Sequence, residues 1–142
     1  MTTKNYHELV KGRVYIGGAD DVEDMMKNEK VDIIFDLRAE APTEESKYNR
    51  VHSPIVDDAD QQDDSVKRSI DRVVNEYHDG KVVYFHCQGG SNRTGTVAIG
   101  TLLALGKAST IEEAEEMAKV ARPKINVKTE MKETLKRIFP SA

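Results

Sequence analysis

The segment 86–96, with the sequence HCQGGSNRTGT, constrains the fold of this chain more than any other part of it. A strand-like run, KVVYF, precedes the segment, and an apolar, helix-like run covers residues 97–105. A strand, a short glycine-containing loop and a helix start turn successive backbone N–H groups toward one point at a helix N-terminus. The chain is therefore predicted to contain a strand that leads into a buried helix, with an anion-binding loop between them.

The residue types within this loop predict what the anion is and what happens to it. Cys87 is the only cysteine of the chain, and the thiolate is the nucleophilic form of that side chain. The loop amides, the Thr94 hydroxyl and the guanidinium of Arg93 are the groups expected to stabilise the thiolate charge. Arg93 can also bind two phosphoryl oxygens at once with its planar fork. The segment thus predicts a phosphate group held against a sulfur nucleophile.

The residues between the cysteine and the arginine are predicted to form a phosphate cradle. The two glycines permit backbone angles that other residues resist, and the serine and asparagine can hold the loop through side-chain to backbone hydrogen bonds. We therefore expect phosphate binding by the whole loop, which consists of Gln88, Gly89, Gly90, Ser91, Asn92 and Arg93.

This segment resembles the signature loop of cysteine-dependent protein-tyrosine phosphatases, in which His-Cys is followed by five residues, Arg, and then Ser or Thr. Gly90 falls on the glycine of that loop and Thr94 on its hydroxyl residue. The short chain is similar to the dual-specificity branch, and the runs 14–18 and 33–38 resemble its first core strands. The resemblance implies that Cys87 forms a cysteinyl-phosphate, that Arg93 binds the phosphoryl oxygens, and that Thr94 eases departure of the sulfur.

The same loop residues also occur in proteins without this chemistry. A lone buried cysteine is usually an inert hydrophobic residue, and a glycine pair before a helix is often only a tight turn. A nucleotide-binding P-loop needs two glycines at the spacing of Gly90 and Gly95, but it also needs a lysine where this chain has Thr96. The phosphatase interpretation is preferred because the whole strand, loop and helix context is present.

Cleavage of a phosphoester also requires an acid that protonates the leaving oxygen. In the family that this chain resembles, the acid follows a Pro–apolar–any pattern about thirty residues before the cysteine. Asp57 fits that pattern, three residues after Pro54, and it would later act as the base that activates water. Asp58 and Asp60 lie in the same acidic stretch and remain alternatives.

The remaining polar residues near the loop have two interpretations each. His86 either supports the cysteine from behind or merely packs at a strand end. The segment 121–124, ARPK, either supplies positive charge at the mouth of the site or is a solvated helix end. The four histidines are far apart in sequence and the single cysteine has no second one beside it, so neither a metal nor another cofactor is expected.

Length and composition limit the class of protein. At 142 residues the chain suffices for one catalytic domain over 1–142. No run is apolar enough for a transmembrane helix, and the first residues do not form a secretory signal. One cysteine allows no internal disulfide, which favours a cytoplasmic location and argues against a cycle with resolving cysteines, as in arsenate reductases. A net charge of −4 predicts neither nucleic acid nor membrane as a partner.

The pattern of apolar residues predicts an α/β fold, with a central, mainly parallel sheet flanked by helices, as in protein-tyrosine phosphatases. Strands are predicted over 13–16, 32–37, 50–55 and 81–86, and helices over 20–28, 64–77, 93–105, 110–121 and 128–138. Thr110 and Glu113 form a capping box. The active site is expected at the carboxyl ends of the parallel strands.

These observations together predict a phosphomonoester hydrolase. The five residues between Cys87 and Arg93 carry no charge, which favours a singly phosphorylated substrate such as phosphotyrosine, with phosphoserine or phosphothreonine as further substrates. The expected partner is a phosphorylated protein or peptide. The alternatives are a phosphoinositide, sugar or nucleotide phosphate as substrate, or a phosphate-binding module without activity.

Overall fold

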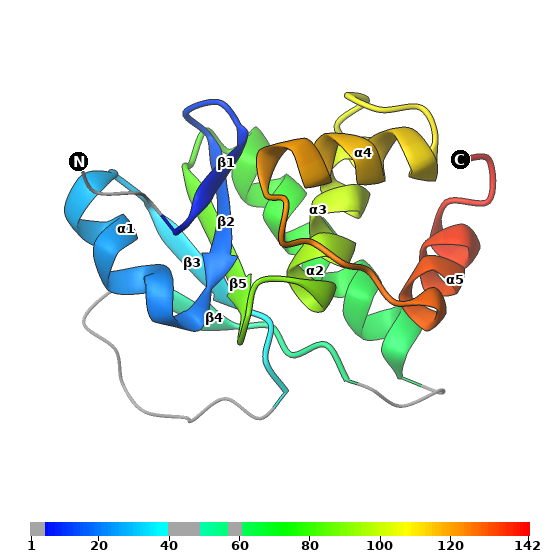
Figure 1. Cartoon of the computed structure of the whole chain (residues 1–142), viewed down its shortest axis with the longest axis horizontal. Coiled ribbons are helices and arrows are strands. Elements are labelled where there is room, and N and C mark those ends of the chain that lie inside the picture. Colours follow the sequence, from blue (N-terminus) through cyan, green and yellow to red (C-terminus); the bar gives the residue numbers. More distant parts are fainter. Residues whose placement is uncertain (1–4, 40–48, 57–60) are drawn as a thin grey trace.

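The computed structural model describes residues 5–39, 49–56 and 61–142. Its described part is an α/β sandwich around one five-stranded sheet (Figure 1). The strands are β1 (His7–Val10), β2 (Val14–Gly18), β3 (Ile33–Asp36), β4 (Arg50–His52) and β5 (Val83–Cys87). They lie in the order β1-β2-β5-β3-β4, and only β1 is antiparallel to its neighbour. The sheet is therefore mixed but mainly parallel, as predicted.

Five α-helices cover the two faces of the sheet unequally (Figure 1). α1 (Val22–Asn28) lies on one face, and α2 (Gln62–His78), α3 (Asn92–Ala104), α4 (Ile111–Ala121) and α5 (Thr129–Ile138) lie on the other. The alternation of side chains along each strand explains this division. On β5, Val83, Phe85 and Cys87 belong to the larger core, while Tyr84 packs in a smaller core with Met25 of α1.

The helix that follows the predicted phosphate-binding loop is the centre of the larger core. Residues Thr94 to Leu102 of α3 are all buried, as the apolar run predicted. Gly100 allows α2 to approach closely, because a Cβ at this position would lie 2.1 Å from Ile70 Cδ1. The rigid packing of α3 therefore fixes where the loop at its N-terminus lies.

Most predicted elements are present, but the sheet differs from the prediction at its edges. β1 was not predicted, because its residues His7–Val10 are half-buried or exposed and show no buried apolar run. β4 ends at His52, whereas the predicted strand continued to residue 55. The chain nevertheless follows β3 beyond that point, since the N–H groups of Ser53 and Ile55 donate to carbonyls of Asp36 and Leu37.

Helix starts differ from the predictions by one or two residues. The helix predicted over 20–28 begins as a 3-10 turn, Ala19–Asp21, before α1. Thr110 caps α4 as predicted and accepts a hydrogen bond from the Glu113 amide at 3.1 Å. The Glu113 carboxylate accepts from the Ser109 amide instead of the Thr110 amide, so the predicted capping box is only half formed.

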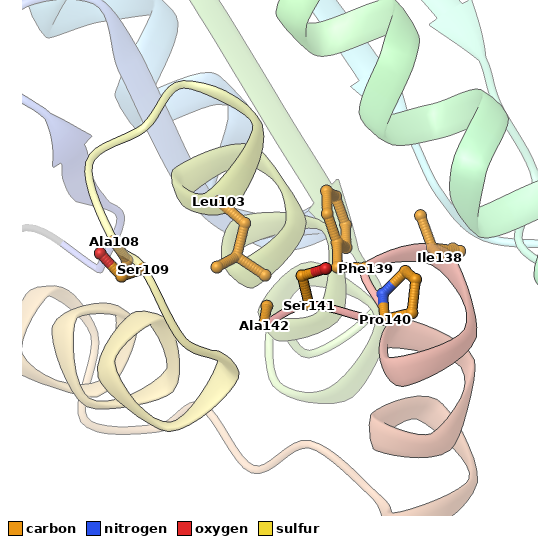
Figure 2. A pocket seen from close by; sticks show the side chains of 8 residues that line it. All are labelled: Leu103, Ala108, Ser109, Ile138, Phe139, Pro140, Ser141 and Ala142. Carbon is orange, nitrogen blue, oxygen red and sulfur yellow. The ribbon is translucent and has the colours of Figure 1, made fainter.

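A hollow of about 320 Å³ lies between the end of α3 and the residues after α5 (Figure 2). Its lining side chains are apolar apart from two serines: Leu103, Ala108, Ser109, Ile138, Phe139, Pro140, Ser141 and Ala142. None of these side chains carries a charge, so they offer no cation to a phosphate. In the described part of the chain, no helix is long and apolar enough to span a membrane.

Candidate active site

The predicted catalytic loop lies at the carboxyl edge of the parallel strands, where the sequence placed it. β5 ends at Cys87 and α3 begins at Asn92, so the loop spans the gap between the central strand and the central helix. Gly18 of β2 pairs with Cys87, and Asp36 of β3 pairs with His86. Two neighbouring strands therefore end beside the loop and contribute residues to it.

The Thr94 hydroxyl holds the sulfur of Cys87. It accepts a hydrogen bond from the Cys87 amide at 2.9 Å and donates to Cys87 Sγ at 3.1 Å. The carbonyl of Gly17 is a second acceptor at 3.4 Å for the same proton. Thr94 is fully buried and Cys87 is 6% exposed. The Thr94 hydroxyl, fixed in the core, is therefore a donor that can stabilise negative charge on the sulfur.

Gly90 and Arg122 give the loop its shape from behind. Gly90 has a φ of +70°, and a Cβ there would lie 2.5 Å from the Gly17 carbonyl oxygen. Arg122 is 2% exposed; its Nε donates to the Gly90 carbonyl at 2.8 Å and its Nη2 to the Gly89 carbonyl at 3.2 Å. Because these carbonyls are held from behind, they are kept away from a bound anion.

The position of Arg122 fits neither of the two interpretations of the segment 121–124. The guanidinium is neither at the mouth of the site nor in solvent. It also donates to the Asn5 carbonyl and lies 3.0 Å from His7 Nδ1, so it joins the loop to β1. Sequence reasoning missed this role, since nothing near Arg122 in the chain indicates which carbonyls it meets.

The loop encloses a pocket of about 310 Å³. The residues that line it are Cys87, Gln88, Gly89, Ser91, Asn92, Arg93 and Lys128. Six of the predicted residues therefore meet around one space, with the predicted nucleophile Cys87 and the predicted phosphate ligand Arg93 both in its lining. Gly90 and Thr94 are buried behind this lining, and Lys128 was not predicted to take part.

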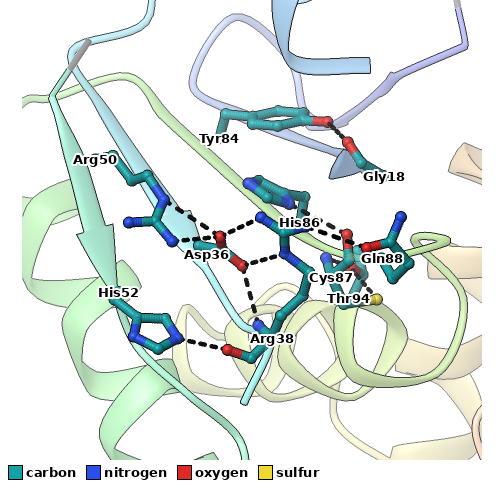
Figure 3. A network of polar contacts seen from close by, with 10 residues as sticks. All are labelled: Gly18, Asp36, Arg38, Arg50, His52, Tyr84, His86, Cys87, Gln88 and Thr94. Carbon is teal, nitrogen blue, oxygen red and sulfur yellow. Dashed lines mark hydrogen bonds and ion pairs between the residues drawn. The ribbon is translucent and has the colours of Figure 1, made fainter. Parts of the chain in front are cut away.

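A buried ionic network adjoins the loop on the β3 side (Figure 3). The Asp36 carboxylate is fully buried and forms ion pairs of 2.7 Å with both Arg38 and Arg50. Burial alone would raise the pKa of Asp36, but the hydrogen bonds from the two arginines outweigh it and hold this pKa well below its usual range. Arg38 also donates to the Gln88 side chain at 3.1 Å, which ties the first loop residue to this network.

His86 lies behind the cysteine rather than in the pocket (Figure 3). It is 2% exposed, and its Nδ1 is 3.1 Å from the Cys87 carbonyl, a contact that requires a proton on Nδ1. Nε2 has no hydrogen-bond partner among the described residues. Burial lowers the pKa of His86, which favours the neutral ring. Of its two predicted roles, this geometry favours support of the cysteine.

The three candidates for the general acid, Asp57, Asp58 and Asp60, lie outside the described residues. The segment before them runs along the end of β3, and the Val56 amide donates to Ser65 Oγ at 3.1 Å. Among the residues that the structure describes, no three His, Cys, Asp or Glu side chains gather as metal ligands.

Comparison with known proteins agrees with this geometry. The profile of the family "dual specificity phosphatase, catalytic domain" matches residues 14–139. A search of curated proteins found no match. The chain belongs to the dual specificity phosphatase catalytic-domain family, and so to the cysteine-dependent protein-tyrosine phosphatase superfamily.

Solved structures share the fold at low sequence identity. DUSP15 superposes with a TM-score of 0.80 at 16% identity, covering 96% of this chain and 88% of that one. Human DUSP28 gives 0.75 at 16%, covering 96% and 93%. Tk-PTP in its active form gives 0.79 at 20%, covering 99% and 100%. The fold is therefore that of small dual-specificity phosphatases.

Proposed function

We propose that this chain hydrolyses phosphotyrosine in proteins, and phosphoserine and phosphothreonine as further substrates, through a cysteinyl-phosphate intermediate. The observation that carries the proposal is the hydrogen bond of 3.1 Å from Thr94 to Cys87 Sγ, beside a pocket that Arg93 lines. A held sulfur, an anion-binding loop and a planar cation are the parts that phosphoryl transfer to a thiolate needs.

In the first step, Cys87 Sγ forms a bond to phosphorus while the ester P–O bond breaks. A carboxylic acid protonates the leaving oxygen, and we assign that acid to Asp57. In the second step, water attacks phosphorus and the S–P bond breaks, while Asp57 accepts the proton of the water. Arg93 and the loop amides stabilise the phosphoryl oxygens in both steps, and the Thr94 hydroxyl stabilises the departing thiolate.

The loop chemistry supports a protein substrate. The five residues between Cys87 and Arg93 are uncharged, so the loop itself offers no additional cation to a polyanionic head group. The same proposal makes residues 1–142 a single catalytic domain in the cytoplasm that requires no cofactor. A phosphorylated protein or peptide is its expected partner.

Hydrolysis of an activated aryl phosphate between pH 4 and 9, with chelator present, tests the nucleophile. The wild type is expected to show a bell-shaped profile that the Cys87→Ser variant lacks. Turnover by Cys87→Ser above background would reject the nucleophile, and a folded wild type without turnover would favour a phosphate-binding module. Phosphopeptides assayed beside a phosphoinositide, a sugar phosphate and a nucleotide then decide the substrate class.

The assignment of the acid needs its own matched set of variants. Asp57→Asn, Asp58→Asn and Asp60→Asn each remove one charge from the same stretch. Asp57→Asn is expected to lower kcat on a phosphotyrosine peptide by about 10²–10⁴, and to lower it less on an ester whose leaving group needs no proton. A larger loss at one of the other two positions would transfer the role to that residue.

A further inference from the structure

Lys128 places a second cation in the wall of the phosphate pocket. It lies 36 residues after Asn92 in the chain, yet both residues line this pocket with Cys87 and Arg93. Among the described residues that line the pocket there is no aspartate or glutamate. The loop segment itself has only one cation, so the charge that an anion meets here is larger than the loop sequence suggests.

The place of Lys128 in its helix is electrostatically unfavourable. Lys128 is the N-cap residue of α5 and forms no side-chain capping hydrogen bond. Ser, Thr, Asp and Asn are preferred at this position, and the positive end of the helix dipole disfavours a cation there. Residues that break a local rule of this kind are expected at functional sites.

Two of the cations of α5 have acidic partners, whereas Lys128, like Lys136 at the far end of the helix, has no ion pair among the described residues. Lys132 pairs with Glu115 at 3.0 Å, and Arg137 pairs with Asp63. The side chain of Lys128 is exposed, so its ammonium group is accessible to a ligand in the pocket.

The backbone at Lys128 is fastened to the catalytic loop. Its amide donates to Asn92 Oδ1 at 2.9 Å, which joins the start of α5 to the start of α3. Both helices therefore begin at the pocket, and neither the first turn of α3 nor the cap of α5 places an acidic residue in the lining. Two helix N-termini and Lys128 therefore add positive potential to that of Arg93 at this pocket, although Glu130 in the first turn of α5 lies outside the lining.

We propose that Lys128 forms a second anion subsite beside the phosphate cradle, so that the enzyme prefers phosphotyrosine flanked by an acidic residue over phosphotyrosine flanked by neutral ones. This inference rests on the proposed function and names its substrate class. The phosphate ester binds to the loop and Arg93, and the flanking carboxylate binds to the ammonium of Lys128.

The test uses two phosphotyrosine peptides that differ only in the residues on either side of the phosphotyrosine, Glu in one and Gln in the other. The wild type is expected to show a kcat/KM about two- to five-fold higher for the Glu peptide, as for a single exposed ion pair. Added salt should reduce this ratio. Lys128→Met removes the charge and should bring the ratio to one, while Lys124→Met, at an exposed lysine outside the lining, should leave it unchanged.

An equal ratio in the wild type and in Lys128→Met would overturn the subsite while leaving the phosphatase function intact. If the wild type hydrolysed neither peptide, the protein-phosphatase proposal would fail. The Lys128 subsite would then be tested separately, by the binding of inorganic anions. Calorimetry would then compare the Kd of pyrophosphate with that of phosphate. A preference for pyrophosphate lost only in Lys128→Met would establish a subsite for a second anionic group beside the phosphate, and an unchanged preference would reject it.

Discussion

Replacement of Arg122 by methionine tests whether the conformation of the loop 87–93 is needed for activity, because the change leaves every residue that lines the pocket in place. Methionine keeps much of the length of the side chain but removes all of its donors. The guanidinium donates three hydrogen bonds to backbone carbonyls, those of Gly90, Gly89 and Asn5. It contributes no group to the pocket lining, so an effect on catalysis must act through the loop.

The contacts of Arg122 allow its contribution to stability to be estimated. Hydrogen bonds from a charged donor contribute roughly 1.5–3 kcal/mol each, and a buried carbonyl left without a partner costs about 1–3 kcal/mol. Gly89 and Asn5 are exposed, so water can replace the guanidinium at their carbonyls, but Gly90 is buried. We therefore expect Arg122→Met to lower the free energy of unfolding by about 2–4 kcal/mol. A domain with roughly 5–15 kcal/mol of stability remains folded after such a loss.

Urea denaturation and steady-state kinetics measure the two effects separately. If the loop depends on Arg122, kcat/KM for an aryl phosphate should fall about tenfold or more, since about 1.4 kcal/mol of lost transition-state stabilisation suffices. Arg137→Met is the control, because Arg137 is an exposed arginine on α5 whose solvent-screened ion pair with Asp63 should contribute little to stability. A folded Arg122→Met variant with the stability or the kcat/KM of the wild type would refute the reasoning.

Three further predictions concern groups around the same loop. Thr94→Val should lower kcat about 10- to 100-fold, because the departing sulfur loses its hydrogen-bond donor and hydrolysis of the cysteinyl-phosphate becomes slow. A burst of product before the slow phase would then be seen. Thr94→Ser should retain most activity, and equal kcat values in both variants would contradict this role. Gly90 has a φ of +70°, and a Cβ there would lie 2.5 Å from a carbonyl oxygen, whereas nothing lies within 4 Å of a Cβ at Gly89. Gly90→Ala should therefore lower the free energy of unfolding in urea clearly more than Gly89→Ala does. Similar losses in the two variants would show that the loop relaxes. The lowered pKa of His86 means that the folded state disfavours its protonation, so this residue's contribution to stability is fully present above about pH 6.5 and is lost as pH falls below that value. His86→Asn should therefore flatten the stability profile below about pH 6.5, by at most about 1.4 kcal/mol per pH unit. An unchanged slope in His86→Asn would contradict the assignment.

The elements that could be predicted from sequence are those with a strong local pattern. The helix α3 and the strand β5 are buried on all sides, and their apolar runs showed this directly. β1 has no such run, because an edge strand with one solvated side needs few apolar residues. β4 was predicted too long because the chain beyond His52 continues along β3 without forming a regular strand.

The catalytic loop could be predicted because its parts are consecutive in the chain. Cys87, Arg93 and Thr94 lie within eight residues, so the strand before them and the helix after them suffice to bring their side chains to one place. The covalent chain and the local backbone geometry therefore place the candidate nucleophile and the candidate phosphate cradle, and the same residues indicated the family.

Only the tertiary structure decided which distant residues complete the site. Asp36 and Arg38 come from β3 and the residues after it, Arg122 from the end of α4, and Lys128 from the cap of α5. Each is an ordinary charged residue in its own sequence context, and a lone arginine or lysine usually lies in solvent. Whether it is buried against a carbonyl, paired with a carboxylate or placed in a pocket wall depends on how helices pack on the sheet. Those contacts span many residues of chain, and no local pattern records them.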